Sequence, residues 1–169
     1  GAMAAQGALV EAVLDAGGFL HGYTYAGNPL ACAAGLAVVG EIERQGLVAN
    51  AEVMGARLSE RLRALMQRYP LIGDVRGKGL LTAMEFVADR ESLDPLPARL
   101  GAHQRFVNMA YERGLIVYSR RSRGGYAGDH VLVAPPLIVT EADLDEIAAL
   151  LDDTLAAFSA EIVAELAVA

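Results

Sequence analysis

The stretch from His21 to Pro29 contains the residues of this chain that are best suited to chemistry. It combines two tyrosines with the hydroxyl of Thr24 and ends in Asn28-Pro29. Asn28 is a preferred helix N-cap residue and Pro29 suits the first helical position, so a helix is predicted to begin here. The free N–H groups of a helix start, together with nearby hydroxyls, form a common anion site. The alternative interpretation is simply a capped helix that follows a turn.

Three other patterns suggest a nucleotide site, a zinc site or a reactive cysteine, but each lacks the residues or spacing that such a site needs. Arg76-Gly77-Lys78-Gly79 lacks the full phosphate-loop pattern and precedes a strand, so it does not predict a nucleotide site. The three histidines have no spacing typical of a zinc site, and only His21 lies near the stretch around Thr24, where it is expected to help shape the pocket. The single cysteine, Cys32, lies among small residues, where an inert buried thiol is expected.

Composition limits the class of protein. A chain of 169 residues is long enough for one domain with a hydrophobic core. The net charge of −7 argues against binding to nucleic acid, which needs clustered Lys and Arg. The apolar fraction of 54% predicts surface that meets another protein or domain. No apolar run is long enough to span a membrane, so we expect no membrane partner and a cytoplasmic location. Residues 1–3 are interpreted as the scar of a cleaved tag.

Periodicity and turn residues predict an alternation of helices and strands. A helix that is apolar on nearly every face is expected to be buried on both sides, and this describes residues 29–45. Residues 76–79 are expected to be flexible, residues 89–97 to form a polar loop, and residues 120–126 to form a basic surface loop. This order of elements favours an α/β layer. Helices are predicted at 5–17, 29–45, 47–69, 98–113 and from Thr140. Strands are predicted within 75–87, with the strongest signal at 79–87, and at 115–118 and 130–134.

Three segments together resemble one known family. HGYTYAGNPLACAAG from residue 21, GDVRGKGLLTAMEFV at 73–87 and GDHVLVAPPLIVTEADLDEI at 128–147 resemble, in order and spacing, segments of class III (ω-type) pyridoxal-phosphate aminotransferases. The resemblance covers only the C-terminal part of such an enzyme. It implies a junction segment at 4–28 and a small domain at 29–169, with an α/β fold that has a short, mainly antiparallel sheet covered by helices.

The resemblance also implies an activity that this chain would not perform alone. These enzymes pass an amino group from an amine or amino acid to a keto acid or aldehyde. The family lysine that binds the cofactor pyridoxal phosphate lies upstream, in a large domain, and Lys78 does not match it. The chain alone is therefore expected to be inactive and to bind the cofactor weakly or not at all. A noncatalytic dimerisation or interaction protein derived from an aminotransferase is the alternative.

The family pattern assigns roles to individual residues. Thr24 matches the threonine that binds the cofactor phosphate from the neighbouring subunit of a homodimer, and Tyr23 and Tyr25 are expected at the entrance to that site. A basic stretch before Pro135 supplies an arginine for a substrate carboxylate in this family, and guanidinium suits that task because it forms two parallel hydrogen bonds. The spacing leaves three joint candidates open, and Arg76 is a further one. The three candidates are Arg120, Arg121 and Arg123.

Overall fold

The computed structural model describes residues 3–19, 21–122 and 127–167. It divides into two compact units, Gly1–Gln45 and Gly46–Ala169, which are considered separately below. The sequence analysis placed residues 29–45 in the small domain, whereas the structure groups them with the N-terminal unit. Among the described residues, no helix combines the length and the apolar character that crossing a membrane requires.

The N-terminal unit consists of α1 (Gly7–Asp15) and α2 (Pro29–Arg44). The Asn28 side-chain oxygen accepts hydrogen bonds from the backbone N–H groups of Leu30 at 3.1 Å and Ala31 at 3.2 Å. These bonds satisfy two of the donors that a helix start leaves free. The predicted N-cap and the predicted start of α2 are therefore confirmed.

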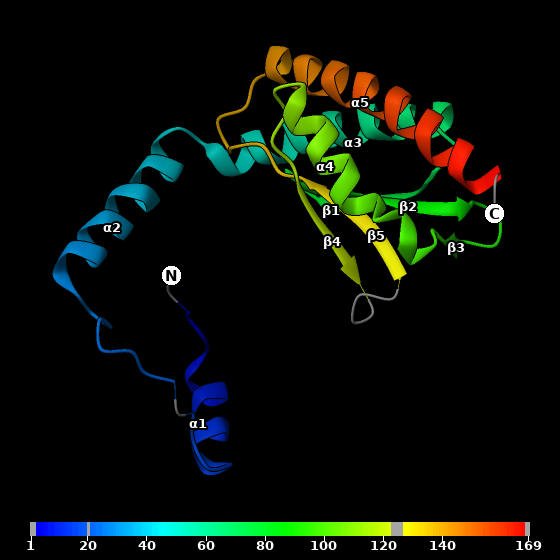
Figure 1. The fold of residues 1–169 in the computed structure, drawn as a ribbon. Helices are drawn as coiled ribbons and strands as arrows, with labels where there is room; N and C mark the ends of the chain where they lie inside the picture. Colours follow the sequence, from blue (N-terminus) through cyan, green and yellow to red (C-terminus); the bar gives the residue numbers. More distant parts are fainter. Residues whose placement is uncertain (1–2, 20, 123–126, 168–169) are drawn as a thin grey trace. The chain divides into compact units, whose positions relative to one another are not determined.

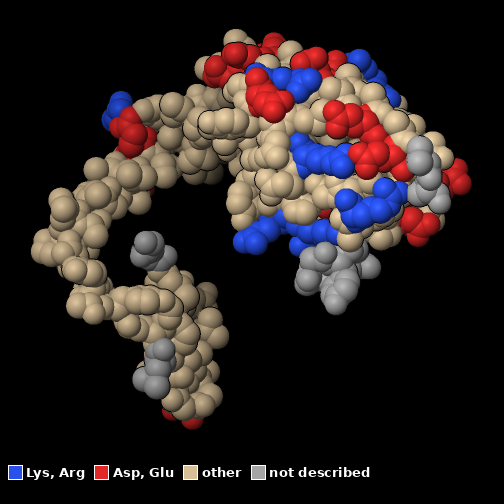
Figure 2. Space-filling model, in the orientation of Figure 1, with Lys and Arg blue, Asp and Glu red and all other residues tan. Residues whose placement is uncertain are grey.

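The two helices of this unit have no buried residue in the described part of the chain. On α2 the large apolar side chains are well exposed, with Leu30 at 80% and Leu36 at 75%. Figure 2 shows this unit as almost entirely uncharged. A helix that is apolar on nearly every face needs a covering surface, and its own unit does not provide one.

The C-terminal unit is built on an antiparallel sheet with the strand order β1-β2-β5-β4. A two-residue strand, β3, pairs with β2 inside the segment that was predicted to be a loop. Because neighbouring strands are antiparallel, residues in register share one face of the sheet. The strands are β1 (Ile72–Lys78), β2 (Leu81–Asp89), β3 (Asp94–Pro95), β4 (Tyr118–Ser122) and β5 (Ala127–Val133).

Three α-helices lie on one side of this sheet: α3 (Leu47–Arg68), α4 (Ala102–Glu112) and α5 (Glu141–Ala167) (Figure 1). α3 packs on β1 and β2, and α4 packs on β4 and β5. No described helix of this unit covers the opposite side, which we call the open face. The expected fold, a short antiparallel sheet covered by helices, is therefore confirmed.

Three phenylalanine rings form the centre of the core between the sheet and the helices. Phe86 on β2, Phe106 on α4 and Phe158 on α5 are each fully buried. The ring of Phe86 lies 5.0 Å from each of the other two rings, and those two are 5.3 Å apart with their planes nearly perpendicular. These distances suit tilted and edge-to-face aromatic pairs, which add to the stabilisation from apolar burial. The side of the sheet that carries Phe86 is therefore the helix side.

α3 contacts the turn between β1 and β2 backbone to backbone. A Cβ atom added to Gly55 would lie 2.3 Å from the carbonyl carbon of Gly79. No real Cβ contact is that short, so only glycine fits at position 55. Gly79 itself has a φ of +54°, which glycine adopts without strain.

One arginine closes the corner where α3 ends and β1 begins. The guanidinium of Arg90, just after β2, donates to the carbonyl oxygens of Met66 at 2.5 Å, Tyr69 at 2.7 Å and Ile72 at 2.9 Å. The last carbonyls of a helix have no partner within the helix, and a cation suits that negative end. Arg90 therefore acts as a C-terminal cap supplied from another element.

α5 begins with the predicted Thr-x-x-Asp box. Further along, hydrogen bonds from Tyr69 and Arg113 to its aspartates hold it on both sides. Asp143 Oδ2 accepts from the backbone N–H of Thr140 at 2.8 Å, and the Asp143 N–H donates to Thr140 Oγ1 at 3.3 Å. On the α3 side, the Tyr69 hydroxyl donates to Asp152 at 2.5 Å, and this bond lowers the pKa of the Asp152 carboxyl. On the other side, Arg113 donates to Asp153 at 2.8 Å. The predicted capping box is confirmed.

Three local predictions were wrong. Arg76 to Lys78 belong to β1 and are not a flexible loop, because they pair with Leu81 to Ala83 across a tight turn. The predicted helix 98–113 is interrupted at Gly101, whose φ of +54° ends a short 3₁₀ turn before α4 begins. The predicted strand 115–118 is not formed, because β4 starts only at Tyr118, where pairing with Leu132 begins.

Candidate functional site

Thr24 lies in a folded segment directly before α2. The N–H of Ala26 donates to the Tyr23 carbonyl at 2.9 Å, and the N–H of Asn28 donates to the Tyr25 carbonyl at 3.0 Å. These bonds form two overlapping turns, and Thr24 is an inner residue of the first. Thr24 is therefore held a few residues before the N-terminus of α2, and its binding of a cofactor phosphate stays a prediction.

The aromatic residues of this segment are arranged in a short stack. The His21 ring lies 5.3 Å from the ring of Phe19 and 4.8 Å, edge to face, from the ring of Tyr23. Tyr23 is 71% exposed and Tyr25 is 80% exposed. His21 thus contacts the residue that precedes Thr24, and its role in shaping a pocket stays a prediction. Binding of a cofactor or substrate by the two tyrosines stays a prediction.

A polar row crosses the open face of the C-terminal unit. Asp74 on β1 pairs in register with Glu85 on β2, Glu85 with His130 on β5, and His130 with Arg120 on β4. The neighbouring row contains Ala83, Leu132 and Tyr118. The alternation of side chains along a strand places both rows opposite the buried phenylalanines. The open face therefore combines charged and apolar groups.

Arg76 belongs to the open face but is already paired. It lies 2.7 Å from Asp74 Oδ2 and 2.6 Å from Glu85 Oε2. The hydrogen bond to Asp74 contributes most to a raised pKa of the Arg76 guanidinium. Contact of Arg76 with substrate stays a prediction, and it would require a carboxylate to compete with these two partners.

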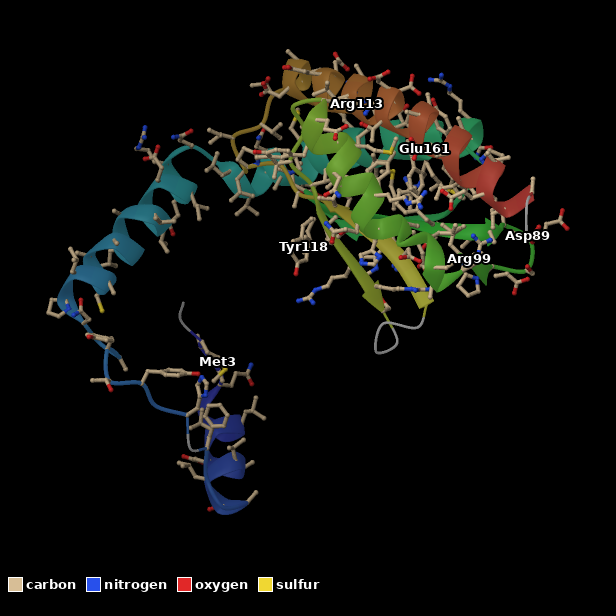
Figure 3. The ribbon with its side chains drawn as sticks, viewed as in Figure 1. Met3, Asp89, Arg99, Arg113, Tyr118 and Glu161 are labelled. Carbon is tan, nitrogen blue, oxygen red and sulfur yellow. The ribbon has the colours of Figure 1, made fainter. Side chains whose placement is uncertain are left out.

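The candidate arginines that the structure describes lie on opposite sides of β4. Arg120 is exposed on the open face, with its guanidinium 5.6 Å from the centre of the Tyr118 ring. Figure 3 labels Tyr118, which projects from β4. Arg121 lies on the helix side, where its side chain is only 9% exposed and donates to the Leu96 carbonyl at 3.1 Å. Arg123, the remaining candidate, lies outside the described residues.

Asp129 is a buried charged residue that the sequence analysis did not identify. It is 1% exposed, and its Oδ2 lies 3.4 Å from Arg121 Nε. Its Oδ1 lies 2.6 Å from His103 Nδ1 and accepts from the His103 backbone N–H at 3.3 Å. Asp129 therefore caps the start of α4, where Gly101 has no side chain to do so. The available sequence signal was a carboxylate directly before the apolar run Val131-Leu132-Val133.

His130 lies on the open face and is held by a bond to the backbone. Its Nδ1 lies 2.9 Å from the carbonyl oxygen of Gly128. A carbonyl oxygen only accepts, so Nδ1 donates in this bond. His130 is thus fixed in the polar row between Glu85 and Arg120.

The hollows found in the C-terminal unit do not coincide with the predicted site residues. A cavity of about 80 Å³ is lined by Glu85, Ser122, Gly128 and neighbouring apolar residues, which is far smaller than the few hundred Å³ of a typical cofactor pocket. A more open hollow lies beside Arg57 and Glu141, between α3 and the start of α5. Within the described ranges, no cluster of three His, Cys, Asp or Glu residues could hold a metal ion.

Comparison with known proteins identifies a family match along most of the chain. The model of the family "Aminotransferase class-III" matches residues 1–155. An uncharacterized aminotransferase of Bacillus subtilis (strain 168), YodT, is 34% identical over 151 residues, which are 88% of this chain and 34% of that protein. The diaminobutyrate--2-oxoglutarate transaminase of Halomonas elongata is 42% identical over 129 residues, which are 76% of this chain and 26% of that protein.

Solved structures of transaminases also resemble this chain. A transaminase from the marine bacterium Virgibacillus has a TM-score of 0.78 at 27% identity, over 86% of this chain and 32% of that one. A PLP-bound amine transaminase from an uncultivated Pseudomonas species has a TM-score of 0.69 at 37% identity, over 85% of this chain and 30% of that one. The chain therefore spans about a third of the length of the relatives it matches.

Proposed function

The chain belongs to the class III aminotransferase family, and from that premise we propose that it forms the C-terminal portion of a pyridoxal-phosphate-dependent aminotransferase. The complete enzyme would move an amino group from an amine or amino acid to a keto acid or aldehyde. The cofactor would supply the electron sink for that chemistry, and the protein would bind and orient the reactants. The family match over residues 1–155 is the observation that carries this proposal.

Among the residues of this chain, Thr24 is our candidate for binding the cofactor phosphate. The overlapping turns hold Thr24 a few residues before the start of α2, and the positive end of that helix dipole favours an anion nearby. We infer that Thr24 reaches the cofactor of the neighbouring subunit in a homodimer, with Tyr23 beside it and Tyr25 at the entrance. The exposed apolar side chains of α2 support an assembly in which other surfaces cover this helix.

Arg120 is our assignment for the substrate carboxylate among the described arginines of β4. It is exposed on the open face, whereas Arg121 is buried and already bonded within the chain. A planar guanidinium can donate two parallel hydrogen bonds to a carboxylate. Its stacking beside Tyr118 limits the directions that the side chain explores, which lowers the entropy lost on binding.

The chain by itself is proposed to be inactive. Its one lysine is Lys78, at the end of β1, where it pairs in register with Leu81 at the edge of the open face. That lysine does not match the family residue that carries the cofactor. The exposed apolar side chains of α2 also agree with the alternative function, a noncatalytic partner of an aminotransferase.

A chimaera would distinguish the two functions. Residues 8–155 would replace the matching part of the Halomonas elongata transaminase, and transamination and cofactor affinity would be measured. We expect activity, and we expect Thr24→Ala to weaken cofactor binding by roughly 10- to 100-fold, the value of a hydrogen bond to a charged group. Thr24→Ser keeps the hydroxyl and is the matched control. A chimaera that folds and dimerises but does not transaminate would favour the noncatalytic function.

A second experiment tests the proposed inactivity of the 169-residue chain. The chain would be incubated with pyridoxal phosphate and reduced with borohydride, and adducts would be mapped by mass spectrometry. We expect no specific adduct. A stoichiometric adduct on Lys78, above that on the N-terminal amine, would contradict the assignment of the cofactor lysine to another part of the enzyme.

A further inference from the structure

The buried carboxylate of Asp129 has a role that the proposed function does not yet use. It is 1% exposed and lies between Arg121 of β4 and His103 of α4. A carboxylate inside a protein is stable only when it is paired and hydrogen-bonded. Asp129 Oδ1 is hydrogen-bonded to His103 on α4, whereas Oδ2 has no hydrogen-bond partner among the described residues and faces Arg121 Nε on β4 as an ion pair.

Arg121 is fixed by this arrangement. Its Nη2 donates to the Leu96 carbonyl at 3.1 Å and its Nε faces Asp129 Oδ2 at 3.4 Å. Because Arg121 and Asp129 are register partners on β4 and β5, the pair also ties the two strands together. The adjacent residue, Arg120, must then point to the open face, since side chains alternate along a strand.

Apolar packing orients the chain up to the start of β4, where Leu115 is buried and Val117 packs against the core, but it adds little within β4 itself. The strand reads Tyr118-Ser-Arg-Arg-Ser122, and its one aromatic residue, Tyr118, is 54% exposed on the open face. The inward positions are Ser119 and Arg121, and neither side chain gains much from apolar burial. Burial within β4 itself therefore specifies the orientation of its later residues, Arg120 and Arg121, only weakly.

We propose that Asp129 is a positioning residue: by holding Arg121 on the helix side, it makes β4 present Arg120 on the open face for a substrate carboxylate. This proposal rests on the proposed function, because it assumes that Arg120 binds that carboxylate. Asp129 itself does not reach the open face and acts only through β4. It therefore decides which of two adjacent arginines a substrate meets.

Arginine labelling of the 169-residue chain tests the proposal. Phenylglyoxal modifies accessible guanidinium groups, and peptide mass spectrometry gives a rate for each arginine. In the unchanged chain we expect Arg120 to react at least about tenfold faster than Arg121, because Arg121 is buried and bonded. In Asp129→Asn, which keeps the shape of the side chain, the rate of Arg121 should rise about tenfold.

Two controls separate this effect from general unfolding. Asp153→Asn removes an exposed carboxylate from Arg113, and it should leave Arg121 protected. Arg90, held by three carbonyl oxygens, should stay protected in every folded variant. If Arg90 becomes reactive in Asp129→Asn, that variant has unfolded, and the test then depends on the rates in the unchanged chain. Equal labelling rates of Arg120 and Arg121 in the unchanged chain would overturn the proposal. An unchanged labelling rate of Arg121 in a folded Asp129→Asn variant would overturn it as well.

Glutarate, a dicarboxylate, separates positioning from substrate binding. We expect glutarate to slow the labelling of Arg120 in the unchanged chain and to slow it less in Asp129→Asn. A purely structural role of Asp129 would not alter this protection. If glutarate has no effect on Arg120 while Arg121 remains selectively protected, the carboxylate role of Arg120 fails, and Asp129 still orients the strand. If Arg120 is equally well protected in a folded Asp129→Asn variant, the positioning role fails.

Discussion

Replacing Asn28 by alanine should partly unfold α2 and leave the C-terminal unit intact. The Asn28 side chain accepts two backbone hydrogen bonds at the start of this 16-residue helix, which has no buried residue in the described part of the chain. Loss of an N-cap costs about 1 kcal/mol. An isolated helix of this length is only marginally stable. Because none of the described residues of α2 is buried, no packing energy compensates for the loss of the cap.

The expected size of the effect follows from this balance. A change of about 1 kcal/mol shifts a local folding equilibrium about fivefold. Amide hydrogen exchange along α2, measured by NMR, should therefore accelerate about fivefold, with a loss of helical Cα shifts. Asn28→Asp keeps an acceptor and adds a favourable charge at the helix start, so it should preserve the helix.

A second control lies in the other unit. The Asn50 side chain donates to the carbonyl oxygens of Leu137 at 2.7 Å and Val139 at 3.1 Å, so Asn50→Ala should weaken the C-terminal unit and leave α2 unchanged. Unchanged exchange in Asn28→Ala would refute the reasoning, because it would mean that contacts with other surfaces, and not the cap, support α2.

Two further predictions concern the C-terminal unit. Gly55→Ala should lower the free energy of unfolding in urea by about 2 kcal/mol or more, because the added Cβ meets the Gly79 backbone. The control is Gly40→Ala, which has open space around it and should favour the helical state of α2. A Gly55→Ala variant as stable as the unchanged chain would contradict the close approach of Gly55 to Gly79. Hydrogen bonding to Tyr69 lowers the pKa of Asp152 in the folded state, so this carboxylate stabilises the fold above the unfolded pKa of about 4 and loses that contribution as the pH falls further. Asp152→Asn should therefore flatten the loss of stability below about pH 4, and an unchanged acid profile would exclude this role.

The elements that sequence predicted correctly are those fixed by short-range chemistry. Asn28 and Pro29 mark the start of α2, and Thr140 with Asp143 marks the start of α5, because each cap involves residues a few positions apart. The Thr24 segment could be located for the same reason. What this segment binds could not be predicted from local chemistry, because the pattern locates the segment and does not show what it contacts.

The errors arose where distant residues decide the structure. The apolar run at Leu115 suggested a strand, but strand pairing starts only opposite Leu132, which local periodicity does not reveal. The basic stretch gave three equivalent arginines, and the partner that distinguishes Arg121, Asp129, became apparent only from the strand register. Glycine at 101 was taken as part of a helix because a single glycine does not by itself end one.

The three carbonyl bonds of Arg90 also have a consequence for the order of folding. The corner between α3 and β1 joins residues that are close in sequence, yet its cap comes from beyond the end of β2. Capping the junction between α3 and β1 therefore requires the β1–β2 hairpin to be in place. The formation of this junction is thus coupled to strand pairing between residues farther apart in sequence. We expect α3, β1 and β2 to form as one cooperative unit during folding, with Arg90 joining them last.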